Sequence, residues 1–380
     1  MKALIGKEEF IGLERCAYLF SGAETPMHRG AMEAAERYMR NRSLGPKGRE
    51  LHAEAELRCK EQLAELLGGE SSQIALMSNA SEAISMIAAA LPLAPGDNVV
   101  VHTLEFPSGV LPWLALKSAG IDVRVVPHRD WTVDAADVLA HVDERTKLVV
   151  TSHVSYLTGA RIDYRALYEA LSRTKTLLLL DATQSLGVIP VDASMADFVV
   201  CSTYKWLLSI HGGGILAVNP ARVGELVPKY VGWRSVTDMF SPYRFESFAF
   251  HADARRFELA YPNYAMVYAL EATTRRLLDV GVERIERHVL GLGDLLIEAL
   301  RELGLELMTP ADGARRAGNV SFLAPRAEEA AERLYEAGVL LWGGDGRIRA
   351  SIHAFNDEED IRTFVEALPA CLPDAGGIAT

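Results

Sequence analysis

A single lysine stands in the segment CSTYKWLLSIHGGG, residues 201 to 214, which carries no other formal charge. A lysine ammonium is strongly hydrated and is seldom fully buried unless it is paired or reacts. Lys205 therefore has three interpretations: a structural ion pair, a surface side chain, or an amine that forms a Schiff base with a carbonyl compound. Residues elsewhere in the sequence that are expected to lie near Lys205 help to decide between these interpretations.

Other polar or aromatic residues follow apolar runs of the kind that form buried strands. Ser78, Asn79 and Ser81 begin a helical pattern, either as a plain N-cap or as a site where backbone N–H groups bind a phosphate. Phe106 follows the next run, either as a core residue or as a flat surface against a ring. Asp181 ends a run of four leucines, either as a helix cap or as a carboxylate directed into a cleft.

With Ser202 and Tyr204 beside the lysine, these residues make up the set that pyridoxal phosphate requires. The lysine forms the Schiff base, a carboxylate such as Asp181 keeps the pyridine nitrogen protonated, and an aromatic face such as Phe106 fixes the ring plane. Taken singly, each residue favours its structural interpretation. The combination predicts pyridoxal phosphate as the cofactor.

The elements that must position these residues are short β-rich runs alternating with helical patterns, which is typical of a mostly parallel sheet covered on both faces. Seven strands are expected, at residues 73–79, 98–103, 123–128, 147–154, 176–182, 196–203 and 213–219. Helices are expected at residues 28–42, 49–67, 81–91, 108–119, 133–141 and 163–173. Ligands bind such sheets beyond the carboxyl ends of the strands, so the candidate residues are expected to meet there.

The pattern changes after residue 263. A long helical region is expected from about 264 to 303, followed by a small α+β unit with strands in NVSFLAP, GVLLWGG and RIRASIHAF and helices at 327–337 and 357–368. We therefore predict a large cofactor-binding domain at 16–263 and a small domain made of 1–15 and 264–380. The tail CLPDAGGIAT is expected to fray.

Composition excludes several classes of protein. The formal net charge is −12 and no block of lysine or arginine occurs, so a nucleic-acid partner is not expected. No run is long and apolar enough for a membrane span and the N-terminus does not resemble a signal peptide, so a cytoplasmic location is expected. The four cysteines are scattered and no histidine stands at ligand spacing, which predicts neither a disulfide framework nor a metal site.

The sequence resembles the class V aminotransferases of the aspartate-aminotransferase fold, a family that includes cysteine desulfurases, kynureninases and isopenicillin N epimerase. The resemblance extends from YLFSGAETP at residues 18–26 to RASIHAFNDEEDI at 349–361. SHVSYLTG, LLLLDATQSLGVIPVD and STYKWL are similar to three motifs of the family, and GWRSV and FELAYPN are similar to two later segments that border its active site. The resemblance implies the fold of the PLP-dependent transferases, a homodimer with the site at the subunit interface, and a small amino-acid substrate.

The resemblance also implies a role for each matching residue. Lys205 corresponds to the Schiff-base lysine and general base, Asp181 to the partner of the pyridinium nitrogen, and Gln184 to the donor to the phenolic oxygen. Phe106 corresponds to the residue that stacks on the ring, and Arg349 to the arginine that binds the substrate carboxylate; its alternative is an ion pair with one of the acids at 357–360. The phosphate is expected to be held by Ala80, Ser81, Ser202 and Tyr204.

Three departures from the family pattern affect the expected reaction. The segment LYEAGVLLWGGDGRIRAS lacks the cysteine of the cysteine desulfurases, so we expect an enzyme other than a desulfurase with a carrier cysteine. Tyr156 stands where asparagine is usual beside the phenolic oxygen, and it is expected to contact the cofactor. Ala260 and Tyr261 replace glycine and threonine in a segment that comes from the neighbouring subunit, where Tyr261 is expected at the cofactor phosphate.

The expected activity begins with removal of the Cα proton of an amino acid by Lys205. Transamination or β-elimination, including C–S bond cleavage, is the favoured outcome. Two alternatives stay open: an amino-acid epimerase of the isopenicillin N epimerase type, and a PLP-binding protein that has lost catalysis. The residues do not identify the side chain of the substrate.

Overall fold

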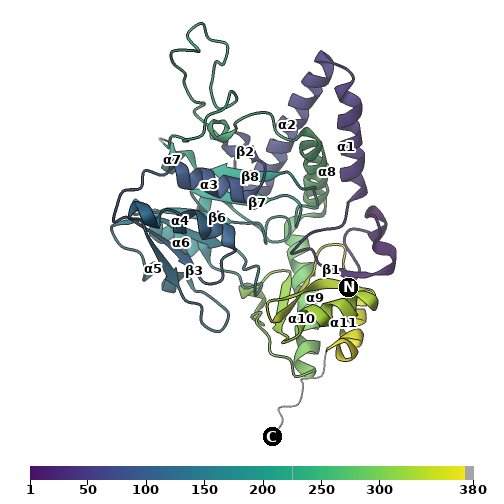
Figure 1. The fold of residues 1–380 in the computed structure, drawn as a ribbon. Helices are drawn as coiled ribbons and strands as arrows, with labels where there is room; N and C mark the ends of the chain where they lie inside the picture. The colour runs from purple at the N-terminus through teal and green to yellow at the C-terminus, as the bar shows by residue number, and fades with distance from the viewer. Residues whose placement is uncertain (225, 373–380) are drawn as a thin grey trace.

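The computed structural model describes residues 1–224 and 226–372, so most of the tail that was expected to fray lies outside the described residues. A seven-stranded sheet forms the centre of the larger part of the chain (Figure 1). Its strands are β2 (Ile74–Met77), β3 (Asn98–His102), β4 (Asp122–Val126), β5 (Thr146–Ser152), β6 (Leu177–Asp181), β7 (Phe198–Ser202) and β8 (Gly214–Val218). All seven expected strands are present, and the predicted fold class is confirmed.

The strand order is β2-β8-β7-β6-β5-β3-β4. Neighbours from β7 to β4 are parallel, whereas β8 is antiparallel to both β2 and β7. The strands are rich in valine, leucine and isoleucine because both faces of the sheet are buried. In β6, Leu178 and Leu180 belong to one hydrophobic core and Leu179 to the core on the opposite face.

Helices cover the two faces and connect the parallel strands. They are α3 (Ala80–Ala90), α4 (Leu111–Leu114), α5 (Ala135–Leu139), α6 (Tyr164–Leu171) and α7 (Pro220–Val223). The helix expected at 108–119 is wrong in length, because only α4 is α-helical and 3-10 turns occupy Pro107–Gly109 and Lys117–Ala119. Val110, between the first turn and α4, leaves helical geometry with φ −120°.

Three long helices pack together at one side of the sheet: α1 (Arg29–Arg42), α2 (Pro46–Leu67) and α8 (Tyr264–Val280) (Figure 1). The helical region expected from 264 to 303 is divided into α8 and α9 (Val282–Glu302). Gly281 separates them with φ 88°, a left-handed value that glycine adopts at no steric cost. The region is therefore broken into two helices at Gly281.

A second sheet has four strands in the order β1-β10-β11-β9. They are β1 (Ala17–Leu19), β9 (Asn319–Leu323), β10 (Val339–Gly344) and β11 (Arg347–Ser351), and α10 (Ala327–Glu336) and α11 (Glu358–Cys371) belong to the same unit. Strand β1, which the sequence did not predict, pairs in parallel with β10 although it follows the expected boundary at residue 16. The division at 16 and 263 stays a prediction.

The N-terminal segment also joins this smaller unit, since the backbone N–H of Leu4 donates to the carbonyl oxygen of Ala354 at 2.7 Å. Among the described residues, no helix combines the length and the apolar character that crossing a membrane would require.

Candidate active site

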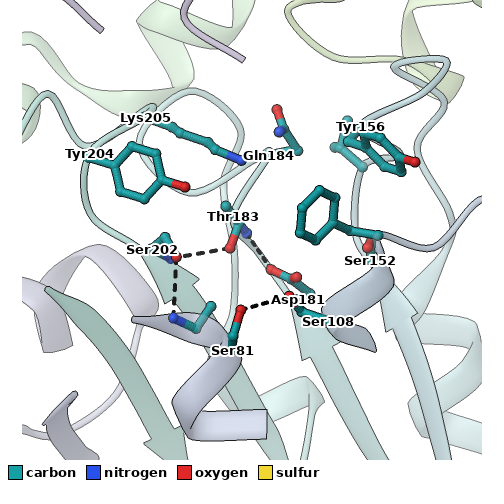
Figure 2. A pocket seen from close by; sticks show the side chains of 13 residues that line it. Ser81, Ser108, Ser152, Tyr156, Asp181, Thr183, Gln184, Ser202, Tyr204 and Lys205 are labelled. Atoms are coloured by element: carbon teal, nitrogen blue, oxygen red, sulfur yellow. Dashed lines mark hydrogen bonds between the residues drawn. The ribbon is translucent and has the colours of Figure 1, made fainter. Parts of the chain in front are cut away.

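Most of the candidate residues meet in one pocket at the carboxyl ends of β5, β6 and β7 (Figure 2). Its lining residues are Ala80, Ser81, Phe106, Ser108, Ser152, Val154, Tyr156, Asp181, Thr183, Gln184, Ser202, Tyr204 and Lys205. Among the predicted site residues, Tyr261 and Arg349 do not line it.

Lys205 lies in the turn that follows β7. The hydroxyl of Thr25, from the N-terminal part of the chain, fixes this turn by donating to the carbonyl oxygen of Lys205 at 2.9 Å. The ammonium Nζ lies 5.6 Å from the ring centroids of both Phe106 and Tyr204, and within the described part of the chain it has no carboxylate within salt-bridge distance. The structure therefore does not support the interpretation of Lys205 as a structural ion pair.

The environment of Lys205 makes it a better nucleophile. Burial is the largest cause that lowers its pKa to about 8, and the positive charge of Arg349 acts in the same direction. The negative charge of Asp181 opposes them. At neutral pH a larger fraction of the amine is therefore uncharged than in an ordinary lysine, which is the form that attacks a carbonyl carbon.

Asp181 is the last residue of β6 and is buried. Its Oδ1 accepts a hydrogen bond of 2.8 Å from the backbone N–H of Thr183 (Figure 2). Burial raises the pKa of Asp181, although the hydrogen bonds from Thr183 lower it in part. A carboxylate in such surroundings is stabilised by a nearby cation, so Asp181 fits a role opposite a protonated ring nitrogen.

The candidate phosphate site lies at the first turn of α3. The backbone N–H of Ala80 points to Ser202 Oγ at 3.2 Å, and the hydroxyls of Ser81 and Ser108 are 2.6 Å apart (Figure 2). Gly214, at the start of β8, lies against this turn, since a Cβ there would be 2.5 Å from the backbone carbon of Asn79. The third glycine of the GGG run therefore permits β8 to pack against the start of α3.

Phe106 and Tyr156 form the aromatic side of the pocket. Their ring centroids are 5.1 Å apart and the rings are nearly perpendicular, at 89°. Phe106 is 41% exposed, which is unusual for a phenylalanine and leaves a ring face available to a ligand. The arrangement fits an aromatic surface against a flat cofactor, as the sequence predicted for Phe106.

Gln184 lines the pocket, but its amide group is largely engaged elsewhere. Its Nε2 donates to the carbonyl oxygen of Gly22 at 2.8 Å, and its Oε1 accepts from Trp206 at 2.8 Å and from Asn319 at 3.1 Å. One N–H of the amide stays free of these contacts. The role of Gln184 toward a phenolic oxygen is therefore limited to that single donor, and it stays a prediction.

Arg349, on β11, is buried beside the pocket. Its Nη1 donates to the carbonyl oxygen of Tyr156 at 2.6 Å, and its Nε has no hydrogen-bond partner. Burial, followed by the like charge of Arg347, lowers the pKa of Arg349. The acids at 357–360 instead pair with Lys7, the N-terminal amine and Arg362, so the alternative of an ion pair with Arg349 is wrong.

Tyr261 lies outside the pocket, in two neighbouring surface hollows. It is 49% exposed, its ring is perpendicular to that of Trp233, and the guanidinium groups of Arg49 and Arg234 lie over it. Its predicted contact is with the phosphate of a neighbouring subunit, which a single chain does not test. That role stays a prediction.

Four lining residues were missed by the sequence: Ser108, Ser152, Val154 and Thr183. Each lies within four residues of a predicted site residue, so the signal was their place at or just beyond a strand end. No group of three or more histidine, cysteine, aspartate or glutamate side chains in residues 1–224 and 226–372 is arranged to hold a metal ion.

The fold and the pocket together define an α/β protein with a partly buried lysine at the carboxyl edge of its sheet. The chain belongs to the aminotransferase class-V family, whose model matches residues 17–364. The predicted family is confirmed, and with it the prediction of a PLP-dependent enzyme of the class-V type.

Two curated relatives and one solved structure illustrate the similarity. An uncharacterized aminotransferase, YcbU of Bacillus subtilis, is 29% identical over 82% of this chain and 82% of its own length. A probable cysteine desulfurase of Methanothermobacter thermautotrophicus is 29% identical over 90% of both chains. The apo structure of a cysteine desulfurase from Thermococcus onnurineus NA1 superposes with a TM-score of 0.89 at 23% identity and covers 96% of this chain and 97% of its own, which shows the shared fold.

The exclusion of a cysteine desulfurase is a prediction that these relatives overturn. Proteins named as cysteine desulfurases match this chain over most of its length, although the segment before Arg349 has no cysteine. The prediction failed for a physical reason: residues at the ends of several strands form the pocket, whereas the exclusion of a desulfurase depended on a single loop side chain. A single missing residue does not separate the chain from these relatives.

Proposed function

We propose that this chain binds pyridoxal phosphate covalently through Lys205 and acts at Cα of an amino acid, with transamination or β-elimination as the outcome. The observation that carries the proposal is the position of Lys205: an amine with a lowered pKa and no carboxylate ion-pair partner within the described chain, which shares a pocket with the buried Asp181. Membership of the class-V family supports the same cofactor.

The pocket fits each part of this cofactor. The N–H groups at the start of α3 and the hydroxyls of Ser81 and Ser202 suit a phosphate. The carboxylate of Asp181 suits the ring nitrogen, and the exposed face of Phe106 suits the ring plane. When bound, pyridoxal phosphate withdraws electrons from a bond at Cα.

The chain supplies binding and proton transfer. Arg349 is proposed to hold the substrate carboxylate, because its guanidinium is buried and has an unpartnered Nε. Lys205 Nζ is then proposed to accept the Cα proton, since its pKa near 8 lies close to neutral pH, where a general base is most effective.

The names of the relatives indicate which substrates to test. Those at 28 to 29% identity include proteins named as an aminotransferase and as a cysteine desulfurase. Cysteine and its conjugates therefore belong in a substrate screen beside ordinary L and D amino acids.

We further propose a homodimer. The segment from residue 227 to 252 projects from the body of the molecule (Figure 1). It exposes a set of large aromatic side chains, namely Tyr230, Trp233, Phe240, Tyr243, Phe245 and Phe248. A concentration of this kind is typical of a surface that meets another protein, and a second copy would also bring Tyr261 near the phosphate.

We also propose a cytoplasmic location. The four cysteines are free thiols, as is usual for proteins of a reducing compartment.

The experiment that tests the proposal is an absorbance screen of the purified protein with L and D amino acids and cysteine conjugates, with products identified by mass spectrometry. The amino form of the cofactor would identify transamination, and an oxo acid with ammonia would identify elimination. Exchange of enantiomers would identify an epimerase. Binding of the cofactor without a response to any amino acid would contradict an enzymatic role. Replacing Lys205 by alanine is expected to lower turnover by about 10² to 10⁴.

A further inference from the structure

We propose that Arg347 and Trp342 form, beside Arg349, a binding site for a second acidic group of the substrate, so that the enzyme prefers amino acids whose side chain ends in a carboxylate. This inference rests on the proposed function, because it assigns the α-carboxylate to Arg349. The inference identifies the class of substrate, which the residues that line the pocket do not identify by themselves.

The strand register places these residues on one face of the smaller sheet. Trp342 is directly opposite Arg349, and Gly344 is directly opposite Arg347. Since side chains alternate along a strand, Arg347 and Arg349 point to the same face. The alternate residue Ile348 is buried in the hydrophobic core on the other face.

Both guanidinium groups of this face contact the same residue of the pocket. Arg349 Nη1 donates to the carbonyl oxygen of Tyr156 at 2.6 Å, and Arg347 Cζ lies 5.6 Å from the centroid of the Tyr156 ring. Tyr156 lines the candidate active site. The face is therefore separated from the reacting centre by no more than one side chain.

The same face carries several hydrogen-bond donors with no partner. Arg347 and Arg349 are 2% and 3% exposed, yet the Nε of each is unpartnered, as is Nε1 of Trp342. Neither an arginine nor a tryptophan side chain accepts hydrogen bonds, so the missing partners must be acceptors. Three oxygens near this face are unpartnered too, those of Asn319, Ser321 and Ser351. None of them accepts a hydrogen bond from these donors. Buried polar groups are rarely left unpaired, so the three donors point to an oxygen-rich ligand.

The indole of Trp342 extends toward Arg347. A Cβ on Gly344 would lie 3.2 Å from Cζ2 and 3.5 Å from Nε1 of Trp342, which shows that the N–H edge of the indole covers the glycine opposite Arg347. The guanidinium of Arg349 lies 5.8 Å from the centroid of the same indole. Trp342 thus contacts the guanidinium of Arg349 and covers the glycine that pairs with Arg347.

The balance of charge also favours an anion. Arg347 has one carboxylate partner, Asp345 at 3.2 Å, which is 71% exposed in the turn between β10 and β11. No carboxylate pairs with Arg349 in the part of the chain that the structure describes. Alternate residues of a strand are on the order of 7 Å apart, so one short dicarboxylic molecule can reach both guanidinium groups.

The test compares glutarate, which has two carboxylates, with butyrate, which has one, by titration calorimetry on the cofactor-loaded protein. Neither compound has an amine, so neither is turned over. Glutarate is expected to bind about 10- to 100-fold more tightly than butyrate. In R347Q this preference is expected to disappear while the affinity for butyrate stays the same. Equal affinities in the unchanged protein would overturn the inference, as would an R347Q variant that weakens both ligands equally, because Arg347 would then act only by positioning Tyr156.

A second variant keeps the test decisive if R347Q does not fold. Asp345 is at the surface, and D345N removes the carboxylate that competes for Arg347. Tighter binding of glutarate by D345N with no change for butyrate would support the inference, and unchanged binding of both would contradict it.

Steady-state kinetics with L-glutamate and L-glutamine then report whether the preference extends to substrates. An enzyme that turns over both equally would refute this substrate class but leave the proposed function intact, whereas failure of Lys205 to bind the cofactor would refute the proposed function.

Discussion

The pKa of Lys205 gives the most specific prediction. In the cofactor-free protein, burial and the charge of Arg349 lower this pKa from 10.5 to about 8. At pH 7 the uncharged fraction is then about one tenth, against about 0.03% for an unperturbed lysine, an increase of about 300-fold. The rate at which pyridoxal phosphate attaches to Lys205 should therefore rise about tenfold per pH unit below pH 8 and level off above it.

Two variants shift this plateau in opposite directions. Arg349→Met removes a positive charge that lowers the pKa of Lys205, so the plateau should move to higher pH while staying below 10.5, because burial is the larger cause and remains. Asp181→Asn removes a negative charge that raises the pKa, so the plateau should move to lower pH. Opposite shifts from two pocket variants are not expected from a general loss of structure.

The assay is stopped-flow absorbance between pH 6 and 11 after mixing cofactor-free protein with pyridoxal phosphate. N-acetyl-lysine, measured in parallel, corrects for titration of the cofactor itself. A rate that keeps rising beyond pH 10, as for the free amine, would refute the account of Lys205, and so would equal plateaus in the two variants.

Three further predictions concern the scaffold. Burial lowers the pKa of His153 and of His353, the latter to about 4, so the neutral forms stabilise the fold above pH 6.5 and this contribution is lost as the pH falls toward 4. Urea unfolding at pH 7 and 5 should show a loss of about 2 kcal/mol from His353 alone, and equal stabilities would contradict this. Gly214→Ala should lower the free energy of unfolding by about 1 to 3 kcal/mol and weaken cofactor binding, because its Cβ would meet the backbone before α3. The control variant Gly291→Ala should not destabilise the protein, because its Cβ meets only a flexible side chain. Similar calorimetric melting temperatures for the two variants would argue against the close approach at Gly214. Lys60→Met should cost about 1 to 3 kcal/mol in chemical unfolding because the buried carboxylate of Glu258 loses its 2.6 Å partner and keeps only Arg234 at 3.1 Å as a cationic partner, and an unchanged stability would be inconsistent with this buried network.

Much of the larger sheet could be predicted because its strands are continuous apolar runs, and such runs are distinctive when both faces are buried. Strand β1 was missed for the opposite reason. It has three residues, and its partner β10 lies more than 300 positions away in the sequence, so no local pattern marks it. The break at Gly281 was missed because the residues on both sides favour a helix, and a single glycine often occurs within one.

The site was predicted where function depends on the type of residue at a strand end, as for Lys205, Asp181 and Phe106, which the structure brings into one pocket. It was not predicted where function depends on register. Arg347 joins Arg349 only because β11 places alternate residues on one face, and the contacts of Gln184 with Gly22 and Asn319 depend on how the two sheets meet. These relationships arise from packing over long sequence distances.

The central claim is that Lys205 carries the cofactor opposite Asp181. The most direct test is borohydride reduction of the protein loaded with pyridoxal phosphate, followed by digestion and mass spectrometry of the labelled peptide. The account predicts one label, on the peptide that contains Lys205, and none in Lys205→Ala. A label on another lysine, or no label in the loaded protein, would contradict it.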